Sequence, residues 1–194
     1  MTQIMENEYS KAEQQQLLQL ARAAIAYQLR HAADFPVQAD DYPPHLRAKR
    51  ACFVTLKTGT QLRGCIGGME PTQALIQEVA SRACDAAFSD PRFRPVQESE
   101  LDQINIHISI LNPMERLTCT NQAGLLRQLR PGIDGILLED GAYHGTFLPA
   151  VWESLPRKED FLKQLMHKAG LRSDYWSSTL RVYRYTCSSF GERP

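Results

Sequence analysis

Residues 51 to 68, ACFVTLKTGTQLRGCIGG, decide the fold around the most informative side chain of this chain, the thiol of Cys65. Two runs rich in β-forming residues, Ala51–Lys57 and Thr60–Ile66, are separated by a Thr-Gly pair, and this pattern predicts a hairpin. The hairpin would deliver Cys65 to the far end of its second strand. Because side chains alternate along a strand with a period of two, we expect Arg63 and Cys65 on the same face.

The neighbours of Cys65 indicate a site without naming a reaction. Gly64, Gly67 and Gly68 remove side chains from around the sulfur, so another backbone or a small ligand could approach it closely. The competing interpretation is structural, because free cysteine is among the most buried residue types. Cys65 is then a small apolar side chain chosen for its fit between glycines, and the sequence leaves both interpretations open.

A helix is expected after this glycine-rich turn. Pro71 and Thr72 are typical of a helix start, and an apolar stripe follows until the chain reaches Pro91. This places the thiol just ahead of a helix N-terminus. The positive end of that helix and the guanidinium of Arg63 would both stabilise a negatively charged sulfur.

The rest of the chain intersperses helices with strands. The capping box Ser10–Glu13 predicts a helix to about His31, and the strict alternation of Ile104–Ile110 predicts a strand that buries four isoleucines. Local patterns add a short helix capped at 121, a hairpin of residues 133–138 and 142–148, a helix of residues 161–169 and a strand of residues 180–185. The order lacks the βαβ rhythm of a doubly wound sheet, so we expect an α+β fold with a mixed or antiparallel sheet flanked by helices.

Composition sets the broad class of the protein. At 194 residues the chain suffices for one domain with a single core. Lys plus Arg equals Asp plus Glu at 22 each, so no global field draws the chain to nucleic acid or to a membrane surface, and we expect neither partner. Five cysteines show neither a disulfide framework nor a zinc pattern. No targeting or membrane segment is visible, and we therefore expect a cytoplasmic protein.

A thiol enzyme usually needs a base, and two histidines are candidates. His107 lies on the polar face of its predicted strand, and His144 lies just past the Asp140-Gly141 turn. For each, a surface or structurally bonded imidazole is the competing interpretation. Cys65 and the two histidines lack the short separations of metal-binding motifs, so we expect no metal site. No nucleotide-binding motif occurs, and the sequence names no cofactor.

Two further segments supply candidate binding residues. In Asp90-Pro-Arg-Phe93, an Asp90–Arg92 pair would hold a surface loop, or Arg92 would bind an anion beside the thiol. In Gly145–Pro149, Thr146 could offer its hydroxyl to a small molecule in a cleft, although a hairpin edge accounts for the segment equally well.

These segments resemble successive blocks of the AMMECR family, called AmmeMemoRadiSam system protein A in bacteria and archaea. The resemblance runs from about Tyr9 to Glu192. It rests on LRGCIG at 62–67, DPRF at 90–93, GIDGI at 132–136, GTFLP at 145–149, FL at 161–162, KAGL at 168–171, Phe190 and Glu192. The chain departs from the usual pattern at Arg94 and Ala150.

The resemblance implies one domain over residues 1–194 with two unequal lobes and an unsettled activity. It also implies action together with a Memo-like metalloprotein and a radical-SAM enzyme. Two functions follow as hypotheses. In the first, Cys65 serves a thiol-dependent small-molecule enzyme, Arg63 holds an anionic group, and His107 or His144 moves protons. In the second, the protein is a non-catalytic binding or adaptor subunit, and Cys65 is structural.

Overall fold

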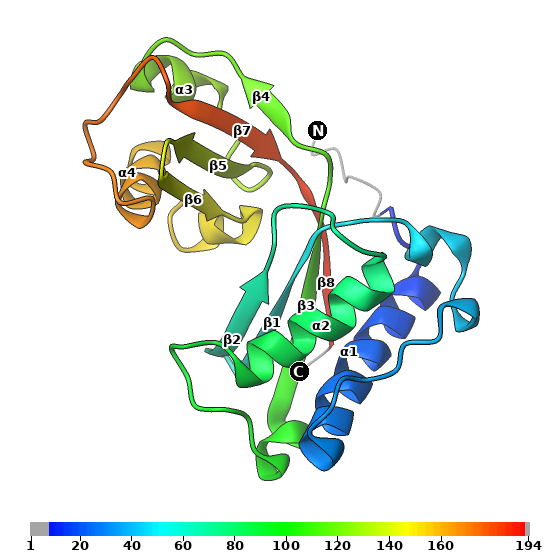
Figure 1. Ribbon diagram of the computed structural model, residues 1–194. Coiled ribbons are helices and arrows are strands. Elements are labelled where there is room, and N and C mark those ends of the chain that lie inside the picture. The colour runs from blue at the N-terminus through cyan, green and yellow to red at the C-terminus, as the bar shows by residue number, and fades with distance from the viewer. Residues whose placement is uncertain (1–7, 193–194) are drawn as a thin grey trace. The chain divides into compact units, whose positions relative to one another are not determined.

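The computed structural model describes residues 8–192 and divides the chain into two compact units of unequal size (Figure 1). Within the described range, the first unit comprises residues 8–111 with 188–192, and the second comprises Asn112–Cys187. Each unit has its own hydrophobic core and its own four-stranded sheet, so the expectation of a single core is wrong. The expected α+β class and the two unequal lobes are therefore confirmed. No helix in the described range has the length and apolar character needed to cross a membrane.

In the first unit, two helices cover one face of an antiparallel sheet (Figure 1). The helices are α1 (Lys11–His31) and α2 (Leu75–Phe88); the strands, in the order β2-β1-β3-β8, are β1 (Cys52–Thr58), β2 (Gln61–Gly67), β3 (Ile104–Leu111) and β8 (Cys187–Gly191). The capping box of Ser10 and Glu13 opens α1 as the sequence predicts. The four isoleucines of β3 are buried, because their shared face packs against the helices.

A glycine sets how closely α2 packs on the sheet. A Cβ built on Gly64 of β2 would lie 2.1 Å from the backbone oxygen of Ala86, near the carboxyl end of α2. The opposite end of α2 is fixed elsewhere, because the backbone N–H of Leu75 donates to the backbone oxygen of Ala48 over 2.9 Å. This helix begins at Leu75, three residues after the expected start, since Pro71 and Thr72 belong to the connecting turn.

The second unit has sheet order β4-β7-β5-β6. Its elements are β4 (Glu115–Leu117), α3 (Gln122–Gln128), β5 (Gly135–Asp140), β6 (Tyr143–Phe147), α4 (Lys158–Lys168) and β7 (Arg181–Tyr185). Both expected helices and the β5–β6 hairpin are present. Asn121 caps α3 through its side chain, and Gly170 follows α4 with φ of 80°. In the core, the Trp152 ring stacks on Phe161 with centroids 3.7 Å apart.

The sequence does not predict two of the strands, β4 and β8. Each is short, and neither shows an alternating pattern that distinguishes it from a loop. Short 3₁₀ turns complete the fold at Ala39–Asp41, Pro44–Arg47, Glu98–Gln103 and Pro149–Glu153.

Candidate functional site

Cys65 lies on β2, the edge strand of the first sheet, directly opposite Thr55 of β1. Gly64 faces α2, so the side chain of Cys65 points to the sheet face turned away from the helices. The thiol is half-buried, and the Thr55 hydroxyl donates a hydrogen bond to its Sγ over 3.2 Å. The Thr55 hydroxyl therefore fixes the position of the sulfur on this face.

The ion pair of Asp90 and Arg92, in which only the carboxylate is buried, holds the backbone of Cys65 from the open side of the edge strand. The N–H of Cys65 donates to Asp90 Oδ2 over 2.9 Å, and Arg92 Nη2 donates both to Asp90 Oδ2 over 2.6 Å and to the Cys65 carbonyl over 3.3 Å. The pair therefore occupies the donor and acceptor positions that a further strand would take. The side-chain hydrogen bond of Arg92 and the backbone N–H of Cys65 hold the pKa of Asp90 well below its ordinary value.

The prediction that a helix N-terminus lies beside the thiol is wrong. Cys65 follows Gly64, which meets the carbonyl of Ala86 at the carboxyl end of α2, and Asp90 follows just after that end. The fourteen residues of α2 place its N-terminus about 20 Å away. The helix end near Cys65 is the partly negative one, so the helix does not help to stabilise a thiolate.

Arg63 does not have the surroundings expected of an anion-binding residue. A register shift between Leu56 and Lys57 breaks the strict alternation of β2 at this point. The Arg63 side chain forms a two-point ion pair with Glu100, with Nε to Oε1 at 2.8 Å and Nη2 to Oε2 at 3.1 Å. Its charge is therefore neutralised within the protein, and Arg63 is not a free anion-binding group beside the thiol.

His107 lies in the same row of the sheet as the thiol. It pairs with Thr55 from β3, as Cys65 pairs with Thr55 from β2, so the three side chains share one face. Two strand spacings separate Cys65 from His107, about 10 Å, which is too far for a direct hydrogen bond. Burial and the nearby charge of Lys57 lower the pKa of His107, against an opposing effect of Glu192. The imidazole is thus neutral at pH 7.

Thr55 and Lys57 are members of this face that sequence reasoning missed. They alternate along β1 with the buried Val54 and Leu56, and Lys57 is half-buried. Among residues 8–192, the ammonium of Lys57 has no ion-pair or hydrogen-bond partner. The signal was present in the sequence, since Thr55 and Lys57 alternate with apolar residues in the first hairpin strand. The alternation does not tell which residues of the neighbouring strands lie beside them.

His144 and Thr146 belong to β6 of the second unit. The imidazole of His144 is exposed and its residue pairs with Glu139. The Thr146 hydroxyl already bonds within the unit, donating to the Ile136 carbonyl over 2.9 Å and meeting the hydroxyl of Tyr185 at 2.6 Å. Its hydrogen-bonding capacity is therefore largely used inside the protein.

The other four thiols are in surroundings that suppress ionisation. Burial raises the pKa of Cys52 far above its usual range and raises that of Cys84 and of Cys187 to about 12. Burial also raises the pKa of Cys119. All five cysteines are unpaired. Among the described residues, no group of three or more His, Cys, Asp or Glu side chains is placed to hold a metal ion.

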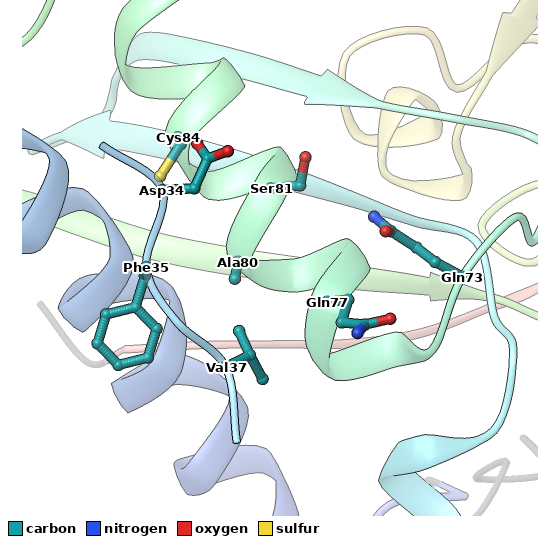
Figure 2. Close-up of a pocket in the computed structure, with 8 residues that line it drawn as sticks. All are labelled: Asp34, Phe35, Val37, Gln73, Gln77, Ala80, Ser81 and Cys84. Carbon is teal, nitrogen blue, oxygen red and sulfur yellow. The ribbon is translucent and has the colours of Figure 1, made fainter. Parts of the chain in front are cut away.

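A cavity of about 270 Å³ in the first unit lies away from this face (Figure 2). It lies between the segment after α1 and the outer side of α2. Its lining residues are Asp34, Phe35, Val37, Gln73, Gln77, Ala80, Ser81 and Cys84. Because α2 covers the opposite face of the sheet from Cys65, the strands stand between this cavity and the thiol. The cavity is therefore not a substrate pocket for Cys65.

Comparison with known proteins places the chain among archaeal relatives. It is 38% identical over 189 residues to a protein of Methanothermobacter thermautotrophicus, covering 94% of this chain and 96% of that one. It is 37% identical to protein MJ0810 of Methanocaldococcus jannaschii, over 89% and 86% of the two chains. The crystal structure of the uncharacterized protein PH0010 from Pyrococcus horikoshii superposes with a TM-score of 0.85 at 34% identity, covering 91% and 90%. The AMMECR1 family model matches residues 18–190, and the chain therefore belongs to the AMMECR1 family.

Proposed function

We propose that the protein is a thiol-dependent enzyme for a small anionic molecule, with Cys65 as its nucleophile. The observation that carries the proposal is the hydrogen bond from the Thr55 hydroxyl to the half-buried Sγ of Cys65. Arg92 supports the same role. Its pKa is raised chiefly by its hydrogen bonds to Asp90, and attraction to Cys65 adds to the effect. The Thr55 hydroxyl and the Arg92 guanidinium thus lie near Cys65, and the thiolate is the reactive form of a cysteine.

The other side chains of this face supply the remaining roles. Lys57 carries an unpaired positive charge among the described residues and would hold the anionic group of the substrate. His107 is neutral at pH 7, so it can accept a proton. About 10 Å separates the two positions, and the imidazole lies against Gly191 of β8, on the side of β3 away from Thr55. His107 would therefore act on a part of the substrate distant from the sulfur and would not deprotonate the thiol itself.

The first test is selective labelling of the thiols. Iodoacetamide at pH 7 should alkylate Cys65 well before the other four cysteines, because burial raises the pKa of each of those four. Peptide mass spectrometry after short exposures measures the order. Thr55→Val should slow alkylation of Cys65, whereas Thr55→Ser, which keeps the hydroxyl, should restore it. A Cys65 that reacts no faster than Cys119, also half-buried, contradicts the proposal.

A second candidate is the non-catalytic binding subunit. The observation favouring it is that Arg63, Asp90 and Arg92 form internal bonds with Glu100, with each other and with the Cys65 backbone. The resemblance of the sequence supports a Memo-like protein and a radical-SAM enzyme as its partners. In this case the amount of purified partner that the protein captures should be unchanged by Cys65→Ala. It should fall with Leu62→Asp, since Leu62 is exposed on the edge strand. Loss with Cys65→Ala at unchanged stability would favour the thiol enzyme.

A further inference from the structure

The second unit contains a cavity of about 480 Å³ that the thiol chemistry does not use. One wall is the edge strand β4 and the residues that follow it, and the other is the segment before β7. Its lining residues are Arg116, Leu117, Thr118, Cys119, Thr120, Trp176, Ser177, Ser178 and Leu180. The volume is sufficient for a small organic molecule.

The lining is divided into an apolar floor and a polar rim. Leu117 is buried, and Trp176 and Leu180 are half-buried with their apolar surfaces against the second core. Arg116 and Thr118 are exposed at the rim, where hydroxyls of neighbouring residues gather. An indole in the floor offers a flat surface for a ring, and a rim of donors offers contacts to polar substituents.

The wall that carries Trp176 is held in place by hydrogen bonds on both sides of the indole. The carboxylate of Asp140 accepts from the hydroxyls of Tyr175 and Thr179, each over 2.7 Å, and from that of Ser177. These three bonds lower the pKa of Asp140, so the carboxylate stays charged and the anchor persists at neutral pH. A cavity wall fixed in this way needs little ordering when a ligand binds.

A single amide ties the start of this wall to α3. The side chain of Gln122 donates to the carbonyls of Ser173 and Tyr175 over 2.8 and 3.0 Å. The facing wall is fixed by the pairing of β4 with β7 and by Gln128, which donates to the Thr118 carbonyl over 3.0 Å. Both walls are therefore anchored without a ligand.

Arg116 brings a positive charge to the rim. The guanidinium of Arg116 has no hydrogen-bond or ion-pair partner within residues 8–192, in contrast to Arg184, which pairs with Glu115 at 2.8 Å. No carboxylate is among the residues that line the cavity.

We propose that this cavity binds a small aromatic anion, with its ring against Trp176 and its phosphate or carboxylate on Arg116. The apolar floor fits a ring, and an unpaired guanidinium can form a bidentate hydrogen bond with either kind of anionic group. The site is independent of the thiol chemistry. It belongs wholly to the second unit, so it can be occupied whether or not Cys65 is a nucleophile.

The test is calorimetric and NMR titration of the full-length protein with adenosine monophosphate and with anthranilate. Adenosine, aniline and inorganic phosphate serve as the uncharged or ring-free counterparts. At least one aromatic anion should bind at one site with a Kd below about 1 mM and roughly tenfold more tightly than its counterparts. Tighter binding of adenosine monophosphate would identify phosphate as the preferred anionic group, and tighter binding of anthranilate would identify carboxylate.

Variants distinguish binding in this cavity from binding elsewhere on the protein. Arg116→Gln, an exposed and unpaired position, should weaken binding roughly tenfold, whereas the control Arg172→Gln, an exposed arginine paired with Asp174, should leave it unchanged. Trp176→Leu should weaken binding of the ring while retaining the fold by near-ultraviolet circular dichroism. Cys65→Ala should have no effect. Absence of binding by both aromatic anions, equal binding of the counterparts, or indifference to Arg116→Gln would overturn the proposal.

Discussion

At the scale of single residues, Asp90 links two motifs that lie 25 positions apart in the chain. Its side chain is 2% exposed and accepts hydrogen bonds from the Cys65 backbone and from the guanidinium of Arg92. Weakening this buried carboxylate as an acceptor leaves the hydrogen bond of the Cys65 N–H poorly satisfied. The segment around Cys65 and the segment around Asp90 are thus joined by these hydrogen bonds. The bonds also cover backbone groups that an edge strand would otherwise leave unpaired.

Asp90→Asn should lower the free energy of unfolding by about 1 to 3 kcal/mol at pH 7, because it weakens hydrogen bonds to a charged group. The pKa of Asp90 is lower in the folded state than the ordinary value of about 3.9. Its contribution is therefore fully present above about pH 4 and is lost as the pH falls below that value. Urea unfolding at pH 7 and near pH 3 should show the difference between variant and wild type shrinking with acid.

Asp174→Asn provides the matched control for this prediction. Asp174 also pairs with an arginine two positions away, but both side chains are more than two-thirds exposed. Such a pair contributes little to stability. A loss at Asp174 as large as that at Asp90 would contradict the role assigned to burial.

At the scale of elements, the contact between β2 and α2 depends on the absence of one side chain. Gly64 lies so close to Ala86 that no Cβ can be accommodated without moving the helix. The same helix leads directly into Asp90, so its position also determines whether the carboxylate reaches the Cys65 backbone. Helix packing and the geometry of the candidate site are thereby coupled.

Gly64→Ala should destabilise the protein by about 2 kcal/mol or more, as expected for overpacking against backbone atoms. It should also shift α2 and so alter iodoacetamide labelling of Cys65. Gly68→Ala is the comparison, because its added Cβ would lie 3.6 Å from the nearest atom, the end of the flexible Arg82 side chain. The midpoint of urea unfolding measures the stability of both variants. Equal midpoints would show that the close approach to Ala86 is relieved without strain.

At the scale of the whole molecule, the last strand returns to the first unit after the chain has formed the second. Glu192, just after β8, accepts from Arg22 Nε over 2.9 Å and Nη2 over 2.6 Å, and from the Ile106 N–H over 2.8 Å. Its own N–H donates to the Ile106 carbonyl over 3.0 Å. One residue near the end of the chain thus connects α1, β3 and β8.

Glu192→Ala should therefore destabilise the first unit by about 1 to 3 kcal/mol and leave the second nearly unaffected. Hydrogen exchange measured by mass spectrometry resolves the two: protection should fall in α1 and β3 and persist in β5 and β7. Glu139→Ala, which removes a partly exposed pair with Arg181 in the second unit, should change neither appreciably. Uniform loss of protection in both units would contradict separate cores.

Local sequence patterns determined the class of this protein and most of its elements. The capping box at Ser10, the alternation of Ile104–Ile110 and the turn at Asp140-Gly141 act over a few residues, so the sequence reveals them directly. Local composition likewise indicated Cys65 and the Asp90 loop as candidate site residues. Family membership was also visible in these blocks, and the matching of residues 18–190 confirms it.

Tertiary structure alone decided which groups meet. Periodicity predicts which face of its strand a side chain lies on, but it does not predict which strand pairs with it or in which register. The position of Thr55 and Lys57 beside Cys65 and His107 was therefore not predicted. It also cannot tell which end of α2 lies near the thiol, or that Glu100 neutralises Arg63. These outcomes depend on contacts between segments distant in sequence, whose free energies compete with one another across the folded core, and no local pattern records the result.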